Sequence, residues 1–160
     1  MSVKIKAVTE SEKAWVLEVV RGWGADFIVS RGRKIYPAEI DAFYAENEAG
    51  EKVGLITYEI ISQQCEIVTL DVFKKFSGIG TALFNKVINE IKSKKVKRIW
   101  LITLNDNLDA IRFYQKRGMT LAAVHVNSLE ISRKIKPSIA KVGQYGIPIR
   151  DEIEFEFFPA

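Results

Sequence analysis

The sequence has few of the residues and patterns that mark several broad classes of protein. Its single cysteine, Cys65, excludes an internal disulfide and is expected to be a small buried residue in a reducing cytoplasm. Residues 1–15 contain no apolar run of the signal-peptide type, and no window is long and apolar enough to cross a bilayer. We therefore expect a cytoplasmic protein that does not contact a membrane.

Metal ligands and clustered positive charge are also scarce. His125 is the one histidine, and since it lies in an apolar alternating segment we interpret it as a structural residue. No group of His, Cys, Asp and Glu has the spacing of metal ligands, so we expect no metal. The net charge is only +4, from 24 Lys and Arg residues spread among 20 Asp and Glu residues, which allows an anionic ligand but does not indicate nucleic acid.

The composition is that of an ordinary globular protein, without internal repeats or low-complexity tracts. The chain has 160 residues, of which 48% are apolar and 28% are charged. That length is enough to bury a sizeable core, so we expect one domain over residues 1–160.

The spacing of apolar residues predicts helices between strands in the second half of the chain and hairpins in the first half. Period-two alternation or short apolar runs predict strands over residues 3–8, 42–48, 53–62, 65–72, 98–103, 119–126 and 153–157. Helical spacing predicts helices over residues 12–23, 78–93 and 107–117. Residues 24–41 are interpreted as a short helix or a loop, and residues 137–148 as turn-rich. This order predicts an α/β fold with a mixed, mostly antiparallel sheet of about six to seven strands flanked by about four helices.

The sequence KKFSGIGTAL, residues 74–83, joins a predicted strand to a predicted helix. The first N–H groups of a helix have no internal partner, and the helix dipole adds positive charge there, so this junction is a candidate anion site. Glycine lets a phosphate approach the backbone, while lysine and hydroxyl side chains add charge and donors. The contributing residues are expected to be Lys74, Lys75, Phe76, Ser77, Gly78, Ile79, Gly80 and Thr81.

Two common nucleotide-binding patterns do not fit this turn. There is no GxxxxGK[ST] sequence, which disfavours a P-loop. Leu83 stands at the third glycine position of GxGxxG, which disfavours a dinucleotide site. A plain tight turn with exposed lysines is the alternative interpretation.

A second candidate element is the predicted helix in NDNLDAIRFYQKRG, residues 105–118. Asn107 and Tyr114 are seven residues apart and therefore lie on nearly the same helix face, with the small Ala110 between them. This face offers an amide, a shallow gap and a phenol. Alternatively, Asn107 is only an N-cap and Tyr114 an ordinary half-buried aromatic residue.

The two elements together resemble the GCN5-related N-acetyltransferase (GNAT) family. The first motif of that family is Arg or Gln, then any two residues, Gly, any one residue, and Gly or Ala. Gly78 and Gly80 match the two last positions. Lys75 stands at the position of Arg or Gln, where it keeps a positive charge but lacks the planar guanidinium of arginine. The family's second element is matched by Asn107, Ala110, Tyr114 and Gly118. The resemblance covers residues 42–126 most clearly and implies the GNAT-like acyl-CoA N-acyltransferase fold.

The resemblance implies an acetyl-CoA-dependent N-acetyltransferase that acts directly on a primary amine of a small molecule, peptide or protein. The glycine turn would hold the pyrophosphate of acetyl-CoA. The strand end at Leu70, Asp71 and Val72 would bind the pantetheine arm through its backbone, with Asn107 and Ala110 beside it. A coenzyme A-binding sensor without turnover is the alternative, and a homodimer is a further possibility.

The resemblance also implies catalytic residues. Tyr114 would lie near the sulfur and protonate the departing thiolate. Glu66 matches the position from which some members supply a base, although a solvent-facing or salt-bridged strand residue is the equal alternative. Asp71 is the other carboxylate, but strict strand alternation places it on the face opposite Glu66 unless a bulge changes the parity.

Two segments give different indications about the acceptor. Arg31, Arg33 and Tyr36 lie where the family covers its acceptor side, and such arginines favour a carboxylate-bearing acceptor such as an amino acid or a peptide end. The alternative for these residues is a solvated loop. The three glutamates of residues 152–156 would instead attract a polyamine or a lysine side chain, or else form an exposed strand face.

Overall fold

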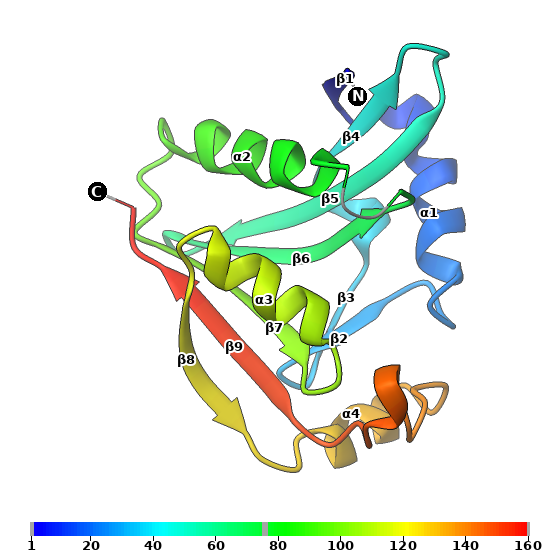
Figure 1. Ribbon diagram of the computed structural model, residues 1–160, viewed down its shortest axis with the longest axis vertical. Helices are drawn as coiled ribbons and strands as arrows, with labels where there is room; N and C mark the ends of the chain where they lie inside the picture. Colours follow the sequence, from blue (N-terminus) through cyan, green and yellow to red (C-terminus); the bar gives the residue numbers. More distant parts are fainter. Residues whose placement is uncertain (1, 75–76, 160) are drawn as a thin grey trace.

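The computed structural model describes residues 2–74 and 77–159, and Figure 1 shows a twisted sheet with helices on both of its faces. Within the described residues the sheet has seven strands in the order β1-β4-β5-β6-β7-β9-β8. β6 and β7 are parallel and the other neighbours are antiparallel, which confirms the predicted mixed, mostly antiparallel sheet. The strands are β1 (Val3–Ala7), β4 (Asp41–Asn47), β5 (Lys52–Ile61), β6 (Gln64–Val72), β7 (Arg98–Leu104), β8 (Thr120–His125) and β9 (Glu152–Phe157).

The four helices of the described residues are α1 (Lys13–Arg21), α2 (Ile79–Ile91), α3 (Leu108–Lys116) and α4 (Leu129–Ile135). α1 follows the 3-10 turn Glu10–Glu12, and its buried Val16 and Val20 pack on Leu55 at one face of the sheet. The apolar stripe of α2 packs on the other face. Within the described ranges, no helix has both the length and the apolar content to cross a bilayer.

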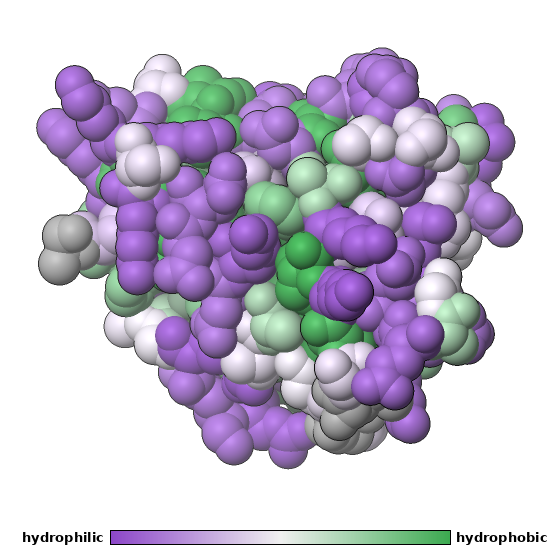
Figure 2. Space-filling model, turned by 90° about the horizontal axis from the view of Figure 1, so that it is seen from above, coloured by the Kyte–Doolittle hydropathy of each residue, from purple (hydrophilic) through white to green (hydrophobic). Residues whose placement is uncertain are grey.

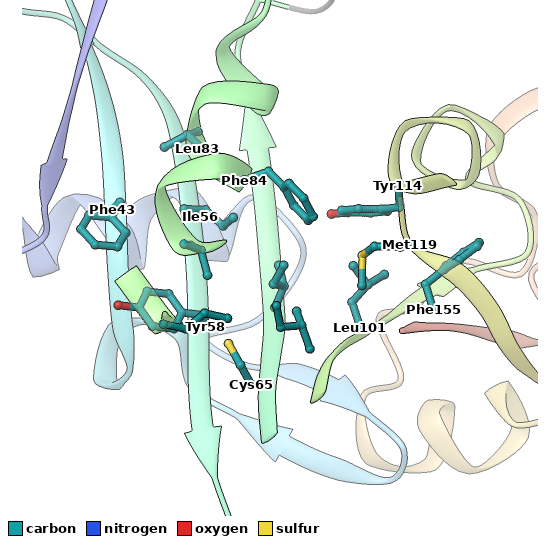
Figure 3. Close-up of a cluster of buried hydrophobic side chains, with 14 of the residues drawn as sticks. Phe43, Ile56, Tyr58, Cys65, Leu83, Phe84, Leu101, Tyr114, Met119 and Phe155 are labelled. Carbon is teal, nitrogen blue, oxygen red and sulfur yellow. The ribbon is translucent and has the colours of Figure 1, made fainter. Parts of the chain in front are cut away.

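The main core lies between the sheet and the pair α2 and α3 (Figure 3). Leu83, Val87 and Ile91 are spaced four apart on α2 and are at most 2% exposed, as their spacing predicts. Cys65 is also fully buried, as expected. Full burial of one aliphatic side chain stabilises a fold by about 1.5–3 kcal/mol, so this stripe fixes α2, and with it the glycine turn, onto the sheet.

β6 and β7 are paired only over their first halves. The pairs run from Gln64 with Arg98 to Ile67 with Leu101, while β6 continues to Val72 and β7 to Leu104. Beyond Ile67 the backbone groups of β6 and β7 that face each other do not form hydrogen bonds between the two strands. Backbone donors and acceptors need partners, so this divergence leaves a place where another chain or a ligand can bind.

Residues 24–41, predicted as a short helix or a loop, instead form mainly a two-stranded hairpin. β2 (Ile28–Ser30) pairs with β3 (Arg33–Ile35), and the 3-10 turn Pro37–Glu39 follows. Arg31 and Gly32 both have positive φ, at 50° and 76°, as a tight hairpin turn of the I′ type requires. The sequence Arg-Gly is not a usual signal for that turn, which is why the hairpin was missed.

α4 was not predicted either, since it is short and its Ile131 is exposed. The turn-rich prediction for residues 137–148 is confirmed: this segment contains an isolated bridge between Val142 and Pro148 and the 3-10 turn Gln144–Gly146.

Figure 2 shows that hydrophilic side chains cover most of the face it views, with smaller hydrophobic groups between them. Such scattered apolar exposure is ordinary for a protein surface.

Candidate active site

Two cavities lie where β6 and β7 diverge. We call the first, of about 520 Å³, the glycine-turn cavity; it runs from Ser77 and Thr81 at the start of α2 along α3 to Tyr114. We call the second, of about 590 Å³, the hairpin cavity; it is bounded by Ser30 of the hairpin and by α4. The residues that line both cavities are Trp23, Leu70, Asn107, Ala110, Tyr114 and Gln144. The two cavities therefore adjoin at the residues singled out on α3.

The two glycines of the turn have different surroundings. Gly78 is the N-cap of α2 with φ of 81°, and a Cβ added there would meet no atom of the described residues within 4 Å. A Cβ on Gly80 would lie 3.2 Å from Phe113 Cε2 and 3.4 Å from Val72 Cγ2. We expected both glycines to admit a ligand, but the close neighbour of Gly80 is α3, and Gly78 is the one that faces open space.

The cations near the turn include one that the sequence analysis missed. Lys74 is exposed, and its carbonyl accepts a hydrogen bond of 2.6 Å from the Ser77 hydroxyl. The predictions for Lys75 and Phe76 lie outside the described residues. Arg117 lines the glycine-turn cavity, and its Nε donates to Thr81 Oγ1 at 2.9 Å. The sequence feature that could have indicated Arg117 is the pair of basic residues at the end of the predicted helix, just before Gly118.

Asn107 and Tyr114 lie as their spacing predicts. Asn107 Oδ1 accepts a hydrogen bond of 3.2 Å from the Ala110 N–H, so Asn107 does cap α3, and its side-chain NH₂ remains as a donor. Tyr114 is 7% exposed and packs near Phe84 and Phe155; Figure 3 labels all three rings. Burial, and then the charge of Asp71, raise the pKa of Tyr114 above its usual value. The phenol is therefore a neutral proton donor at physiological pH.

A bulge in β6 changes which carboxylates share a face. Ile67 pairs with Tyr58 and Thr69 pairs with Thr57, so Val68 is an extra residue on β6. Strict alternation placed Asp71 opposite Glu66 unless a bulge changed the parity, and the structure contains that bulge. Glu66, Thr69 and Asp71 pair with Glu59, Thr57 and Leu55, alternate residues of β5, and so all three point to the same face of the sheet.

The Asp71 carboxylate is buried without a full set of partners. Its Oδ2 atom is buried and has no hydrogen-bond partner within the described ranges. Burial raises the pKa of Asp71 to about 6, with a hydrogen bond to the Trp23 side chain acting in the opposite direction. Asp71 lines the glycine-turn cavity beside Tyr114. It is thus a carboxylate that is mostly ionised at neutral pH and still able to accept a proton.

Glu66, in contrast, is held by this chain's own donors. It is 4% exposed, accepts a hydrogen bond of 2.6 Å from Ser30 Oγ and forms an ion pair of 3.1 Å with Arg33. Burial raises the pKa of Glu66, while Ser30 and Arg33 lower it. Glu66 lines the hairpin cavity, so it contributes polarity there even though both of its oxygens have donors.

The predicted acceptor residues are engaged elsewhere. Arg33 also pairs with Glu59 at 2.9 Å, and Arg31 pairs at 3.0 Å with Glu152, whose side chain is 1% exposed. Tyr36 is 40% exposed and packs near the ring of Phe27. These three side chains are not among the residues that line the two cavities. Their role toward an acceptor stays a prediction.

The glutamates of β9 are also paired. Glu154 contacts His125 Nε2 at 2.8 Å, and Arg98 contacts both Glu154 and Glu156. His125 is therefore part of an ion-paired strand face, in agreement with its structural interpretation. No group of three or more His, Cys, Asp or Glu residues in the described part of the chain is placed to hold a metal ion.

Comparison with known proteins bears on this site. The model of the acetyltransferase (GNAT) family matches residues 14–119. The uncharacterized protein YdhI of Bacillus subtilis is 51% identical over 117 residues, which is 73% of each chain. Among solved structures, an IAA acetyltransferase from Bacillus cereus superposes with a TM-score of 0.73 at 16% identity, over 99% of this chain and 100% of that one. A Bacillus subtilis acetyltransferase in complex with CoA superposes with a TM-score of 0.71 at 18% identity and the same coverage. These two structures share the fold.

Proposed function

Because the chain belongs to the acetyltransferase (GNAT) family, we propose that it transfers an acetyl group from acetyl-CoA directly to a primary amine. Membership supports acetyl transfer in general, and the amine acceptor is our proposal. The observation that carries it is the meeting of the two cavities at Tyr114, with a helix N-terminus along one and buried carboxylates beside their junction.

The glycine-turn cavity has the donors that acetyl-CoA needs. α2 is 13 residues long and directs its unpaired N–H groups and its positive dipole end at the Gly78 side, where an added Cβ would meet none of the described residues within 4 Å. Arg117 and Lys74 add positive charge for the phosphates. Beyond Ile67 the β6 backbone is not paired with β7, so its groups at Leu70–Val72 are available to the amides of the pantetheine arm.

We assign the base to Asp71 rather than to Glu66. An acceptor amine with a pKa near 10 is mostly protonated at neutral pH, so a proton must be removed before or during attack. Asp71 Oδ2 lies next to Tyr114 and accepts no hydrogen bond from the described residues, whereas both Glu66 oxygens already accept hydrogen bonds. Glu66 then serves as a fixed polar group of the hairpin cavity.

Tyr114 is assigned the acid role. As the amine nitrogen bonds to the acetyl carbon and the carbon–sulfur bond breaks, the departing thiolate needs a proton. Tyr114 lines both cavities, is held by aromatic packing and has a neutral hydroxyl, so we assign it the donation of that proton. The acetyl oxygen gains negative charge in the same step and requires a nearby donor, for which a backbone N–H at the end of β6 is suited.

The test has a binding part and a turnover part. Calorimetry with acetyl-CoA should show saturable binding, and a thiol-release assay over a panel of amines should show turnover that depends on the amine. Binding without turnover for any amine would favour the coenzyme A sensor. The absence of binding would remove the donor site from the glycine-turn cavity.

A further inference from the structure

The hairpin cavity is lined by a buried lysine that forms no ion pair with a carboxylate in the described part of the chain. Lys136, directly after α4, is 6% exposed and lines this cavity. Its Nζ donates to the Phe27 carbonyl at 3.2 Å, and no ion pair joins it to a carboxylate of the described residues. Buried charges in proteins are usually paired, because removing them from water is costly. Lys136 therefore brings to the wall of this cavity a positive charge that no carboxylate of the described residues pairs with, which indicates an anionic ligand.

Hydroxyl groups lie in the same part of the wall. Ser132 is one helical turn before Lys136, is 2% exposed, and its carbonyl accepts the Lys136 N–H at 2.8 Å. Ser138 lines the cavity two residues after Lys136. Burial lowers the pKa of Lys136, and no charge of the described residues acts against it. The Ser132 hydroxyl donates to the Ser128 carbonyl at 3.4 Å, so the donors that suit a carboxylate here are the Lys136 ammonium and the Ser138 hydroxyl.

The carboxylates that line the hairpin cavity do not take this role. Glu66 is bound by Ser30 and Arg33. Asp106 accepts a hydrogen bond of 2.9 Å from the Gln144 N–H. Each is thus oriented by donors other than Lys136.

We propose that the acetyl acceptor carries a carboxylate and that Lys136 binds it, with Ser138 beside it. The acceptor class is an amino acid or the carboxyl end of a short peptide, which fits a cavity of about 590 Å³ with apolar walls from Ile28 and Leu129. The amine of such a molecule extends to the junction at Tyr114. This inference rests on the proposed function, and it gives Lys136 the role that the sequence indicated for Arg31 and Arg33.

The experiment compares acid and amide forms of the same acceptor. Each amino acid and its C-terminal amide is assayed by thiol release with acetyl-CoA, using wild type, Lys136→Met and Lys134→Met. Lys134 is an exposed lysine on α4 and serves as the matched control. We expect wild type and Lys134→Met to prefer the acid at least tenfold in kcat/KM, and Lys136→Met to lose that preference to within threefold.

Equal rates for acid and amide in wild type, or an unchanged preference in Lys136→Met, would overturn the proposal. Lys136 also holds the Phe27 carbonyl, so its replacement can weaken the hairpin. A purely structural role would lower the melting temperature and reduce the rates for acid and amide by the same factor. That outcome would likewise overturn the proposal.

A binding measurement separates this inference from the proposed function. Calorimetry in the presence of CoA uses N-acetyl amino acids and their amides, which need no turnover. If no amine is acetylated but the acids bind wild type at least tenfold more tightly than Lys136→Met, the carboxylate site stands and acetyl transfer fails. If none of the acids binds wild type, the carboxylate site is wrong.

Discussion

The two cavities that meet at Tyr114 differ in how the chain builds them. The glycine-turn cavity comes mainly from short stretches close in the sequence, residues 70–72, 77–81 and 107–117. The hairpin cavity is assembled from several separated stretches, with walls from residues 22–30, 66–70, 101–107 and 129–144. The first includes the N-terminal end of α2, and the second includes the buried side chains of Glu66 and Lys136. The difference indicates that the donor site is encoded locally, whereas the acceptor site depends on the tertiary fold.

The largest expected effect tests which cavity's carboxylate acts at the junction. Asp71→Asn keeps the shape of the side chain and removes its basicity, so we expect turnover at pH 7 to fall by about 10²–10⁴-fold with acetyl-CoA affinity nearly unchanged. Glu66→Gln is the control, and its rate should fall by less than about tenfold. Steady-state kinetics and calorimetry give both quantities. A larger loss in Glu66→Gln would return the base role to the hairpin cavity.

The next effect concerns Tyr114, one of the residues that line both cavities. Tyr114→Phe keeps the ring and its packing with Phe84, so the fold should survive. A proton donated only in the transition state affects turnover and not binding, so we expect a fall of about tenfold to a thousandfold, or about 1.4 to 4 kcal/mol of barrier. Acetyl-CoA affinity should stay within about threefold. If affinity and melting temperature collapse with the rate, Tyr114 is a core residue only.

The cost of burying the Asp71 carboxylate should appear in the stability of the protein. The folded-state pKa of Asp71, about 6, lies above its ordinary 3.8, so the folded protein binds the proton more tightly. The stabilisation that the folded state gains from the proton on Asp71 is complete below about pH 4 and is lost as the pH rises through 6. We expect Asp71→Asn to be more stable than wild type at pH 7.5 by up to about 3 kcal/mol, and equally stable near pH 4. Urea titrations at both pH values measure the difference. A variant less stable at pH 7.5 would show that Asp71 is paired.

The smallest effect tests the claim that the donor site is backbone-based. Gly78 and Gly50 have φ values of 81° and 80°, and an added Cβ meets none of the described residues within 4 Å at either. Gly78→Ala and Gly50→Ala should therefore carry a similar strain of about 1 kcal/mol. Only Gly78→Ala should also weaken acetyl-CoA binding, by about tenfold in calorimetry. Equal affinities in the two variants would argue that the pyrophosphate binds away from this turn.

The sequence predicted what depends on local pattern. The stripe of Leu83, Val87 and Ile91 placed α2, and the spacing of Asn107 and Tyr114 placed both at the junction of the cavities. Asp71 could not be placed, because the extra residue at Val68 changes the strand parity and leaves no mark in the alternation. Lys136 was missed because it follows a short helix whose role depends on contact with the distant hairpin.

The most direct test of the account is a crystal structure of the protein with CoA. The account predicts the pyrophosphate at the N-terminus of α2 beside Gly78, the pantetheine arm along β6 at Leu70–Val72, and the sulfur within about 4 Å of the Tyr114 hydroxyl. The hairpin cavity should remain open for the acceptor. CoA bound in the hairpin cavity, or a sulfur remote from Tyr114, would contradict the account.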